Sequence, residues 1–245
     1  MSAGVHPFAP LVISHAACKG HAPENTLAGI AAALEMGADG IEIDVQASAD
    51  GVPVLMHDSN VDRTTDGSGE VSSLTFAELR RLDAGARPFE GRFRGEKIPT
   101  LAEVLEMVKG RVLLVMEIKQ LGIEEAVLKV VHDLDALDDC VVHSFFPQIV
   151  AAFRRAEPRL PAALVTHPHD DWAQFYAFVL SLNAQGVSVL HTGVDAAMAR
   201  SARLRKLTLY TWSPNEPEDM RRLIDCGVDA IITDYPDRLR SLLGP

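Results

Sequence analysis

Short apolar stretches rich in Val, Ile and Leu alternate along this chain with longer segments in which apolar residues recur every three or four positions. Continuous apolar runs are typical of strands buried on both faces, and the longer spacing is typical of helices that bury one face. The predicted strands are residues 11–15, 40–46, 52–57, 111–119, 140–145, 161–166, 186–192, 207–212 and 229–235. The predicted helices are residues 25–37, 124–134, 147–156, 171–182, 194–204, 216–227 and 236–243.

This order of elements predicts an α/β fold with a parallel sheet, because strands that alternate with helices form βαβ units. About eight such units follow one another, which is the number that closes a (β/α)8 barrel. We therefore expect one barrel domain over residues 1–245. Residues 58–100 interrupt the alternation with a polar, Gly- and Pro-containing stretch and one predicted helix at 75–83. We expect this stretch to be an insertion packed at one rim of the barrel.

The composition and charge of the chain bear on its binding partners and on its location in the cell. Hydrophobic residues make up 47% of the 245 positions and charged residues 23%, as in ordinary globular proteins. A formal net charge of −11 disfavours nonspecific binding to nucleic acid, although it does not exclude a phosphate substrate. The chain has no apolar run long enough to span a membrane and no recognisable signal peptide, so we expect a cytoplasmic location.

Three carboxylates stand on two of the predicted strands. Glu42 and Asp44 are two positions apart and therefore point to the same face of their strand, and Glu117 and Lys119 repeat this spacing. Carboxylates crowded on a buried face need a cation, protons or basic partners. Their oxygen atoms suit one divalent cation such as Mg²⁺ or Ca²⁺. The alternative is a structural ion pair, for example between Glu117 and Lys119.

Two histidines lie where strands end, His15 after the first and His57 after the third. Cleavage of a phosphodiester needs a base that activates the nucleophile and an acid that protonates the leaving oxygen, and histidine can do both near neutral pH. Asp58 follows His57 directly and lies in a segment that can fix the orientation of that ring. Six of the other seven histidines lack such a setting and are predicted to be structural or exposed: His21, His132, His143, His167, His169 and His191.

These residues belong to a series of spaced motifs that runs along nearly the whole chain. They are ISH and HAPENTLAG, GADGIEIDVQASADGVPVLMHD, VDRTTDGSG, MEIK, TWSPN and GVDAIITDYP. In this order, from residue 12 to about residue 243, they resemble the bacterial glycerophosphodiester phosphodiesterase family. The resemblance implies a TIM (β/α)8 barrel and metal-dependent hydrolysis of glycerophosphodiesters to glycerol 3-phosphate and an alcohol.

The resemblance also implies a role for individual residues. The acid–base pair would be His15 and His57. The metal ligands would be Glu42, Asp44 and Glu117. Substrate would be bound by Lys119 on the phosphate side and by Trp212 near the glycerol, and the supporting residues would be Glu24 and Asp58. Glu24 by itself is also explained as an acidic residue at a helix start.

One position departs from the pattern of the family. Ala16 follows His15 where an arginine is usual, and Lys19 is either a partial replacement or an exposed loop charge. The departure keeps two alternatives open. One is a phosphodiesterase of the same fold with another specificity, such as a lysophospholipase D or a sugar-phosphodiester hydrolase. The other is a noncatalytic phosphodiester-binding protein. The sequence leaves a homo-oligomer possible.

Overall fold

The computed structural model describes residues 9–244, and within them eight parallel strands form a closed barrel. The ring closes because β1 pairs with β2 on one side and with β9 on the other. Its strands, in order around the barrel, are β1 (Leu11–Ser14), β2 (Gly40–Ala47), β4 (Leu113–Ile118), β5 (Cys140–Ser144), β6 (Ala162–Thr166), β7 (Gly186–Leu190), β8 (Thr208–Trp212) and β9 (Ala230–Thr233). The fold is a TIM barrel, as the sequence predicts.

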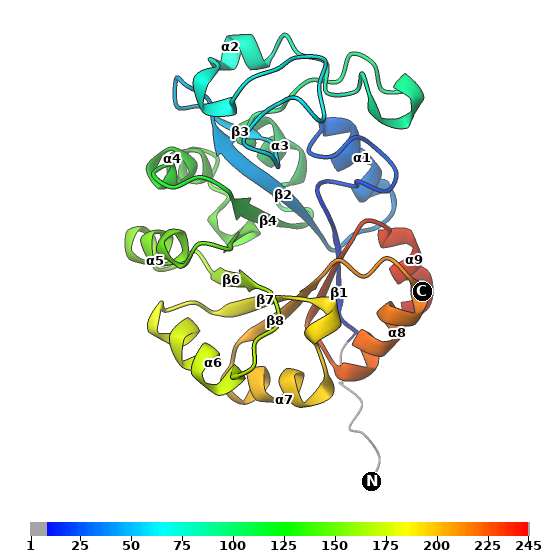
Figure 1. The fold of residues 1–245 in the computed structure, drawn as a ribbon, viewed down its shortest axis with the longest axis vertical. Helices are drawn as coiled ribbons and strands as arrows, with labels where there is room; N and C mark the ends of the chain where they lie inside the picture. Colours follow the sequence, from blue (N-terminus) through cyan, green and yellow to red (C-terminus); the bar gives the residue numbers. More distant parts are fainter. Residues whose placement is uncertain (1–8, 245) are drawn as a thin grey trace.

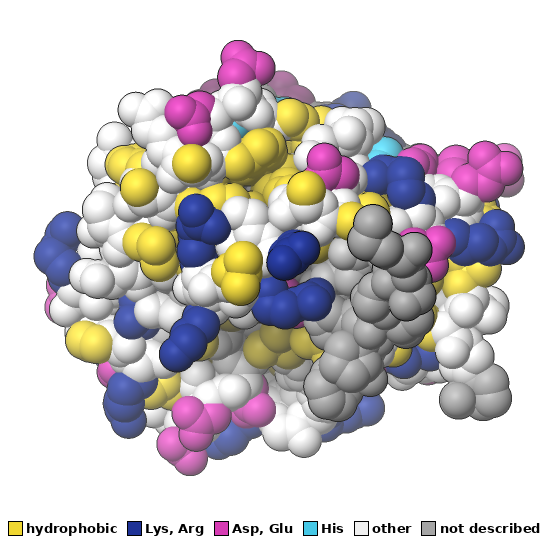
Figure 2. Space-filling model, turned by 90° about the horizontal axis from the view of Figure 1, so that it is seen from below, with side chains coloured by type: hydrophobic (Ala, Val, Ile, Leu, Met, Phe, Trp, Pro, Cys, Tyr) yellow, Lys and Arg dark blue, Asp and Glu magenta, His cyan; other side chains and the backbone are white. Residues whose placement is uncertain are grey.

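Helices surround the strands, as Figure 1 shows. They are α1 (Leu27–Glu35), α3 (Leu101–Val108), α4 (Glu124–Asp133), α5 (Pro147–Ala156), α6 (Trp172–Ser181), α7 (Ala196–Leu204), α8 (Pro217–Cys226) and α9 (Pro236–Leu243). In the part of the chain that the structure describes, no helix combines the length and the apolar character needed to cross a membrane. On the face in Figure 2, Lys and Arg side chains are dispersed among apolar, neutral and acidic ones.

Alternation along each strand divides the apolar residues between two cores. Val12 and Leu114 belong to the larger core, whereas Ile13 and Val115 belong to a small cluster with Tyr210. Neighbouring residues of a strand point to opposite faces, so the small cluster fills the inside of the barrel and the large one lies beneath the helices. Side chains that follow the small cluster along the strands therefore project into the mouth at their carboxyl ends.

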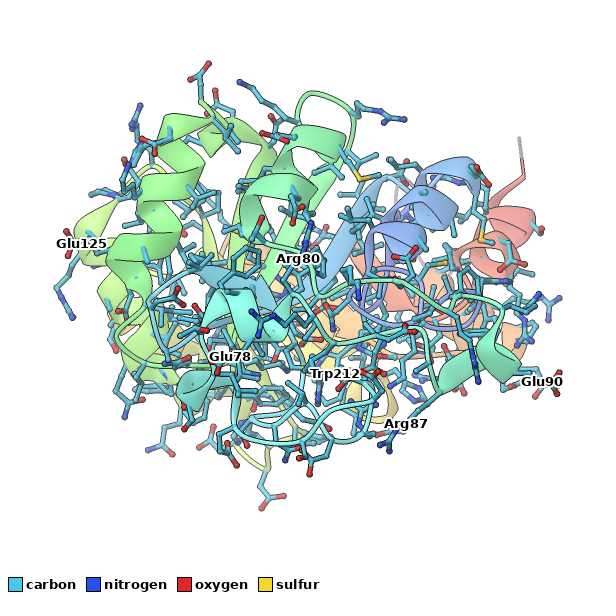
Figure 3. All side chains as sticks on the ribbon, turned by 90° about the horizontal axis from the view of Figure 1, so that it is seen from above. Glu78, Arg80, Arg87, Glu90, Glu125 and Trp212 are labelled. Carbon is cyan, nitrogen blue, oxygen red and sulfur yellow. The ribbon has the colours of Figure 1, made fainter. Side chains whose placement is uncertain are left out.

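The insertion between β2 and α3 has a small core of its own. It begins with β3 (Pro53–Leu55), which pairs antiparallel with β2 outside the ring, and it includes α2 (Phe76–Leu79). Its buried apolar residues are Val54, Met56, Val61, Val71, Leu79, Ala84 and Ile98. Figure 3 shows α2 with Glu78 and Arg80 in one part of the insertion, and Arg87 and Glu90 in another. Arg80 also forms an ion pair with Glu103 of α3, which ties the insertion to the barrel.

Two details differ from the predicted elements. The helix expected at 75–83 ends at Leu79, and the Asp83 carboxylate instead accepts backbone hydrogen bonds from Gly85 and Gly95 in a loop. Helix α3 was not predicted from the sequence. It starts at a capping box in which Thr100 and Glu103 satisfy each other's backbone N–H groups. Its apolar face is short and directly follows the polar stretch 58–100, so the helical spacing of its apolar residues is difficult to recognise in the sequence.

We predict that Leu79→Ala lowers the free energy of unfolding by about 2–5 kcal/mol, because it leaves a cavity in the core of the insertion. Leu79 is 0% exposed, whereas Leu204 is 74% exposed, so Leu204→Ala is a matched control that should change stability by no more than about 0.5 kcal/mol. Urea unfolding followed by circular dichroism measures both. Equal stability of the two variants would mean that the insertion core does not contribute to global folding.

Candidate active site

A cavity of about 170 Å³ opens among the residues at the carboxyl ends of the strands. Its wall includes six of the residues singled out from the sequence, namely His15, Glu42, His57, Glu117, Lys119 and Trp212. These residues lie on β2, β4 and β8 or shortly after β1, β3 and β4, so closure of the barrel brings them together. In TIM barrels this end of the strands is where active sites lie.

Carboxylate oxygens of Glu42, Asp44 and Glu117 lie within 4.8 Å of one another. The strand register accounts for part of this arrangement, because Asp44 on β2 is paired with Glu117 on β4. Burial, followed by the charge of Asp44, raises the pKa of Glu42 to about 8. Burial also raises the pKa of Glu117. The cluster is therefore short of positive charge in the absence of a cation.

Lys119 supplies part of the missing positive charge. Its Nζ lies 2.9 Å from Oδ1 of Asp44 and donates a hydrogen bond to Oε1 of Glu117. Burial alone would raise the pKa of Asp44, but the charge of Lys119 and the hydrogen bonds to Asp44 lower it. Lys119 thus contacts two of the three carboxylates, whereas Glu42 is faced by His15, whose Nε2 lies 3.9 Å from Oε2 of Glu42.

The donor set fits a hard divalent cation. Oε1 of Glu42 is buried and has no hydrogen-bond partner, while Oε2 accepts the backbone N–H of Ala16 at 2.7 Å. A buried carboxylate oxygen without a partner is costly unless a cation or a proton satisfies it. Carboxylate oxygens from three side chains are the ligands that Mg²⁺ and Ca²⁺ take in proteins. A purely structural ion pair does not account for the free oxygen of Glu42.

Both candidate acid–base histidines use Nδ1 to contact an aspartate. Nδ1 of His15 lies 2.6 Å from Oδ1 of Asp234, and Nδ1 of His57 lies 2.7 Å from Oδ1 of Asp58. Burial lowers the pKa of His15, but the Asp234 hydrogen bond and the nearby charges of Glu42 and Asp44 raise it to about 9 overall. Each contact fixes the ring and leaves Nε2 as the atom available for proton transfer.

A short network holds Asp58 in place. Nε of Arg63 donates to Asp58 at 2.6 Å, and the NH1 and NH2 groups of Arg63 donate to Glu24 at 2.9 and 2.6 Å. The hydrogen bond from Arg63 is the main cause that lowers the pKa of Asp58 to about 2. Glu24, predicted as a supporting residue, is therefore linked to His57 through Arg63 and Asp58.

Lys19 lies outside the central cavity. Its Nζ is 3.6 Å from Glu24, and it lines a neighbouring cavity together with Arg63 and Arg87. Ala16, at the position where the resemblance led us to expect an arginine, has a positive φ of 46° and is 2% exposed. Its methyl group leaves the mouth of the barrel without a guanidinium at this position. Among the described residues that line the central cavity, Lys119 is the only Lys or Arg.

Trp212 on β8 forms an aromatic wall with two residues that directly follow β5 and β6. The ring centre of Trp212 lies 5.6 Å from that of Phe145 and 5.5 Å from that of His167. The indole Nε1 of Trp212 donates to the carbonyl oxygen of Ser188 at 3.2 Å, which fixes the ring at the rim. An apolar wall of this kind suits the carbon skeleton of a small ligand.

Three residues at the site were not identified from the sequence. Asn25 donates to Asp44 Oδ2 at 2.7 Å and accepts the backbone N–H of Asp44 at 2.9 Å, although its position suggested only a helix start. Asp234 lies in the last motif but had no assigned role. His143, classed as structural or exposed, lines the cavity. No spacing along the sequence pointed to His143, because its place beside Glu117 follows from the pairing of β5 with β4.

Comparisons with known proteins gave matches over most of the chain. The glycerophosphoryl diester phosphodiesterase family model matches residues 15–238. The chain is 37% identical to YhdW of Bacillus subtilis, with 92% of this chain and 95% of that protein covered. It is 35% identical to a glycerophosphodiester phosphodiesterase of Caldanaerobacter subterraneus, with 95% and 97% covered.

A solved structure extends the comparison to a bound molecule. The chain is 30% identical to a phosphodiesterase of Oleispira antarctica, whose structure is a complex with the product sn-glycerol-3-phosphate. The TM-score is 0.88, and the match covers 96% of this chain and 97% of that one.

We predict that His143 makes the protein less stable in acid. Burial lowers the pKa of His143 from 6.5 to about 3. Between these values the unfolded chain binds a proton that the native protein does not bind. The free energy of unfolding should therefore fall as pH falls through this window, by up to about 1.4 kcal/mol per pH unit. Urea unfolding of His143→Phe should show a smaller loss between pH 6.5 and 4.5 than the natural protein, and an identical loss would contradict the burial of a neutral ring.

Proposed function

Because this chain belongs to the glycerophosphoryl diester phosphodiesterase family, we propose that it hydrolyses glycerophosphodiesters to glycerol 3-phosphate and an alcohol with the help of one divalent cation, Mg²⁺ or Ca²⁺. The observation that carries the proposal is the buried cluster of Glu42, Asp44 and Glu117, which shares one cavity with His15 and His57. The product complex of the Oleispira antarctica phosphodiesterase supports the same class of substrate.

The two histidines divide the proton transfers in this proposal. One removes a proton from the nucleophile, which is either water or the 2-hydroxyl of the substrate's glycerol, and the other protonates the leaving oxygen. Asp234 and Asp58 each contact Nδ1 of one ring, which leaves Nε2 as the reacting atom. The available contacts support either division of the two roles between His15 and His57.

Glu42, Asp44 and Glu117 would hold the cation, and Asn25 would orient Asp44. When bound, the cation polarises a phosphoryl oxygen and offsets the charge that develops there. Lys119 adds a second positive charge on the β4 side. Trp212 and Phe145 exclude water from the organic part of the substrate by covering it with their rings.

A second candidate function is hydrolysis of a lysophospholipid by the same site. Phe146 and Leu121 follow strands β5 and β4 at the mouth of the barrel and are 47% and 57% exposed. An exposed apolar rim is suited to an acyl chain. A panel of glycerophosphodiesters with and without an acyl chain, assayed for release of the alcohol, separates the two activities. Binding of every diester without release of any alcohol would instead indicate a noncatalytic protein.

We predict that His57→Ala lowers kcat by about 100- to 10,000-fold while the fold is kept, because it removes one of the two proton-transfer groups. His132→Ala is a matched control, since the side chains of His57 and His132 are 48% and 46% exposed and His132 pairs with Glu157 away from the cavity. The control should retain near-natural activity. Glycerol 3-phosphate release from glycerophosphocholine measures both, and near-natural rates for His57→Ala would refute the scheme.

We also predict that chelation by EDTA abolishes turnover and lowers the melting temperature, because the three carboxylates then repel one another in a buried setting. Addition of Mg²⁺ or Ca²⁺ should restore both, and the ion that restores them at the lower concentration identifies the preferred metal. Glu117→Gln should weaken this thermal response. Full activity after exhaustive chelation would contradict the proposed role of the cation.

A further inference from the structure

Two buried polar groups in the active-site cavity have no hydrogen-bond partner and no part in the proposed chemistry. They are Nε2 of His143 and Oγ of Ser188. Both residues are 1% exposed, and both line the cavity that contains His15 and Glu117. Buried polar atoms without a partner are uncommon in folded proteins, and each is costly unless a ligand or a water molecule satisfies it.

The barrel fixes where these two groups lie. His143 on β5 is paired with Glu117 on β4, so its ring projects into the barrel next to the carboxylate cluster. Ser188 on β7 lies between Val187 and Val189, which face the outer core, so its hydroxyl points inward. The ring of His143 packs edge-to-face against Tyr210, with the ring centres 4.5 Å apart.

The surroundings of the two groups select a neutral ligand. Val165 and Ile232 line the same cavity, and Phe145 and Trp212 form its aromatic wall. His143 is neutral near pH 7 because burial lowers its pKa to about 3. A neutral imidazole and a serine hydroxyl can each donate or accept one hydrogen bond, which matches an alcohol rather than a phosphate. The anionic part of a substrate belongs instead on the side of Lys119.

We propose that His143 and Ser188 bind the terminal hydroxyl of the substrate's glycerol, the one remote from the phosphate, and thereby determine specificity for a glycerol-containing diester. This inference rests on the proposed function, because it assigns the glycerol to the cavity. The 2-hydroxyl stays next to the phosphate and the carboxylates. The terminal hydroxyl then reaches the two unpartnered groups between the aromatic wall and Tyr210.

The protein would select substrates that carry this hydroxyl, because binding a substrate without it costs free energy. A substrate without it leaves two buried polar atoms unpaired, and sites built in this way discriminate strongly against such analogues. A trapped water molecule is the competing occupant, since the cavity of about 170 Å³ is large enough for one. If water fills this position in all complexes, removal of the hydroxyl from the substrate should change little.

The experiment compares two substrates that differ by one oxygen. One is glycerophosphocholine, and the other is its analogue in which propane-1,2-diol replaces glycerol, so that the 2-hydroxyl is kept and the terminal hydroxyl is lost. We expect the natural protein to prefer the glycerol substrate by about 10- to 100-fold in kcat/KM. Ser188→Ala and His143→Phe should each reduce this preference several-fold, mainly through a loss on the glycerol substrate. Phe keeps a ring next to Tyr210.

Ser14→Ala provides a matched control, because Ser14 is 0% exposed but lies next to the inward-facing Ile13 and therefore points out of the barrel. It should keep the natural preference.

Equal losses on both substrates in the two test variants would show a structural role and overturn the inference. A natural protein that cleaves both diesters equally would also overturn it while leaving the proposed function intact. Cleavage of neither diester would refute the proposed function itself. If His143→Phe does not fold, Ser188→Ala decides the question.

Discussion

The mouth of this barrel is organised around the repulsion among three buried carboxylates. Glu42, Asp44 and Glu117 are brought within 4.8 Å of one another by two adjacent strands, in a place where water cannot screen their charge. Asn25, Lys119 and the N–H of Ala16 each stabilise part of the cluster. These contacts leave one oxygen of Glu42 unsatisfied. An oxygen buried in this way is satisfied by a proton or by a cation.

Each of the two catalytic candidates His15 and His57 contacts an aspartate through Nδ1, but one contact is local in the sequence and the other is not. Asp58 is the sequence neighbour of His57, so their contact is local and was suggested by the sequence. Asp234 is 219 positions from His15, and the two meet because β9 pairs with β1 and closes the barrel. This difference also explains why one aspartate was predicted and the other was not. Contacts that depend on closure of the ring cannot be read from the spacing of residues along one strand.

The sequence predicted the barrel, its strands and the two acid-bearing strands because these depend on patterns within short segments. The i and i+2 spacing of Glu42 and Asp44 was enough to place both on one face. His143 was missed because its significance depends on the register between β4 and β5, which places it beside Glu117. The helix expected at 75–83 was too long because the loop contacts of Asp83 are nonlocal. The role of Lys19 stays a prediction, since its contact with Glu24 gives it a structural explanation as well.

Because position 16 is an alanine, any positive charge for a phosphate must come from other groups near the site. Arg63 is near the site, but Glu24 and Asp58 already occupy its guanidinium group. Lys119 lines the cavity, but its ammonium group faces Asp44 and Glu117. In the described part of the chain, no Arg lines the central cavity, and its one lysine already has two carboxylate partners. Phosphate binding should then depend on a metal cation more strongly than it would in a relative with an arginine at this position, because the cation must offset both the carboxylates and the substrate.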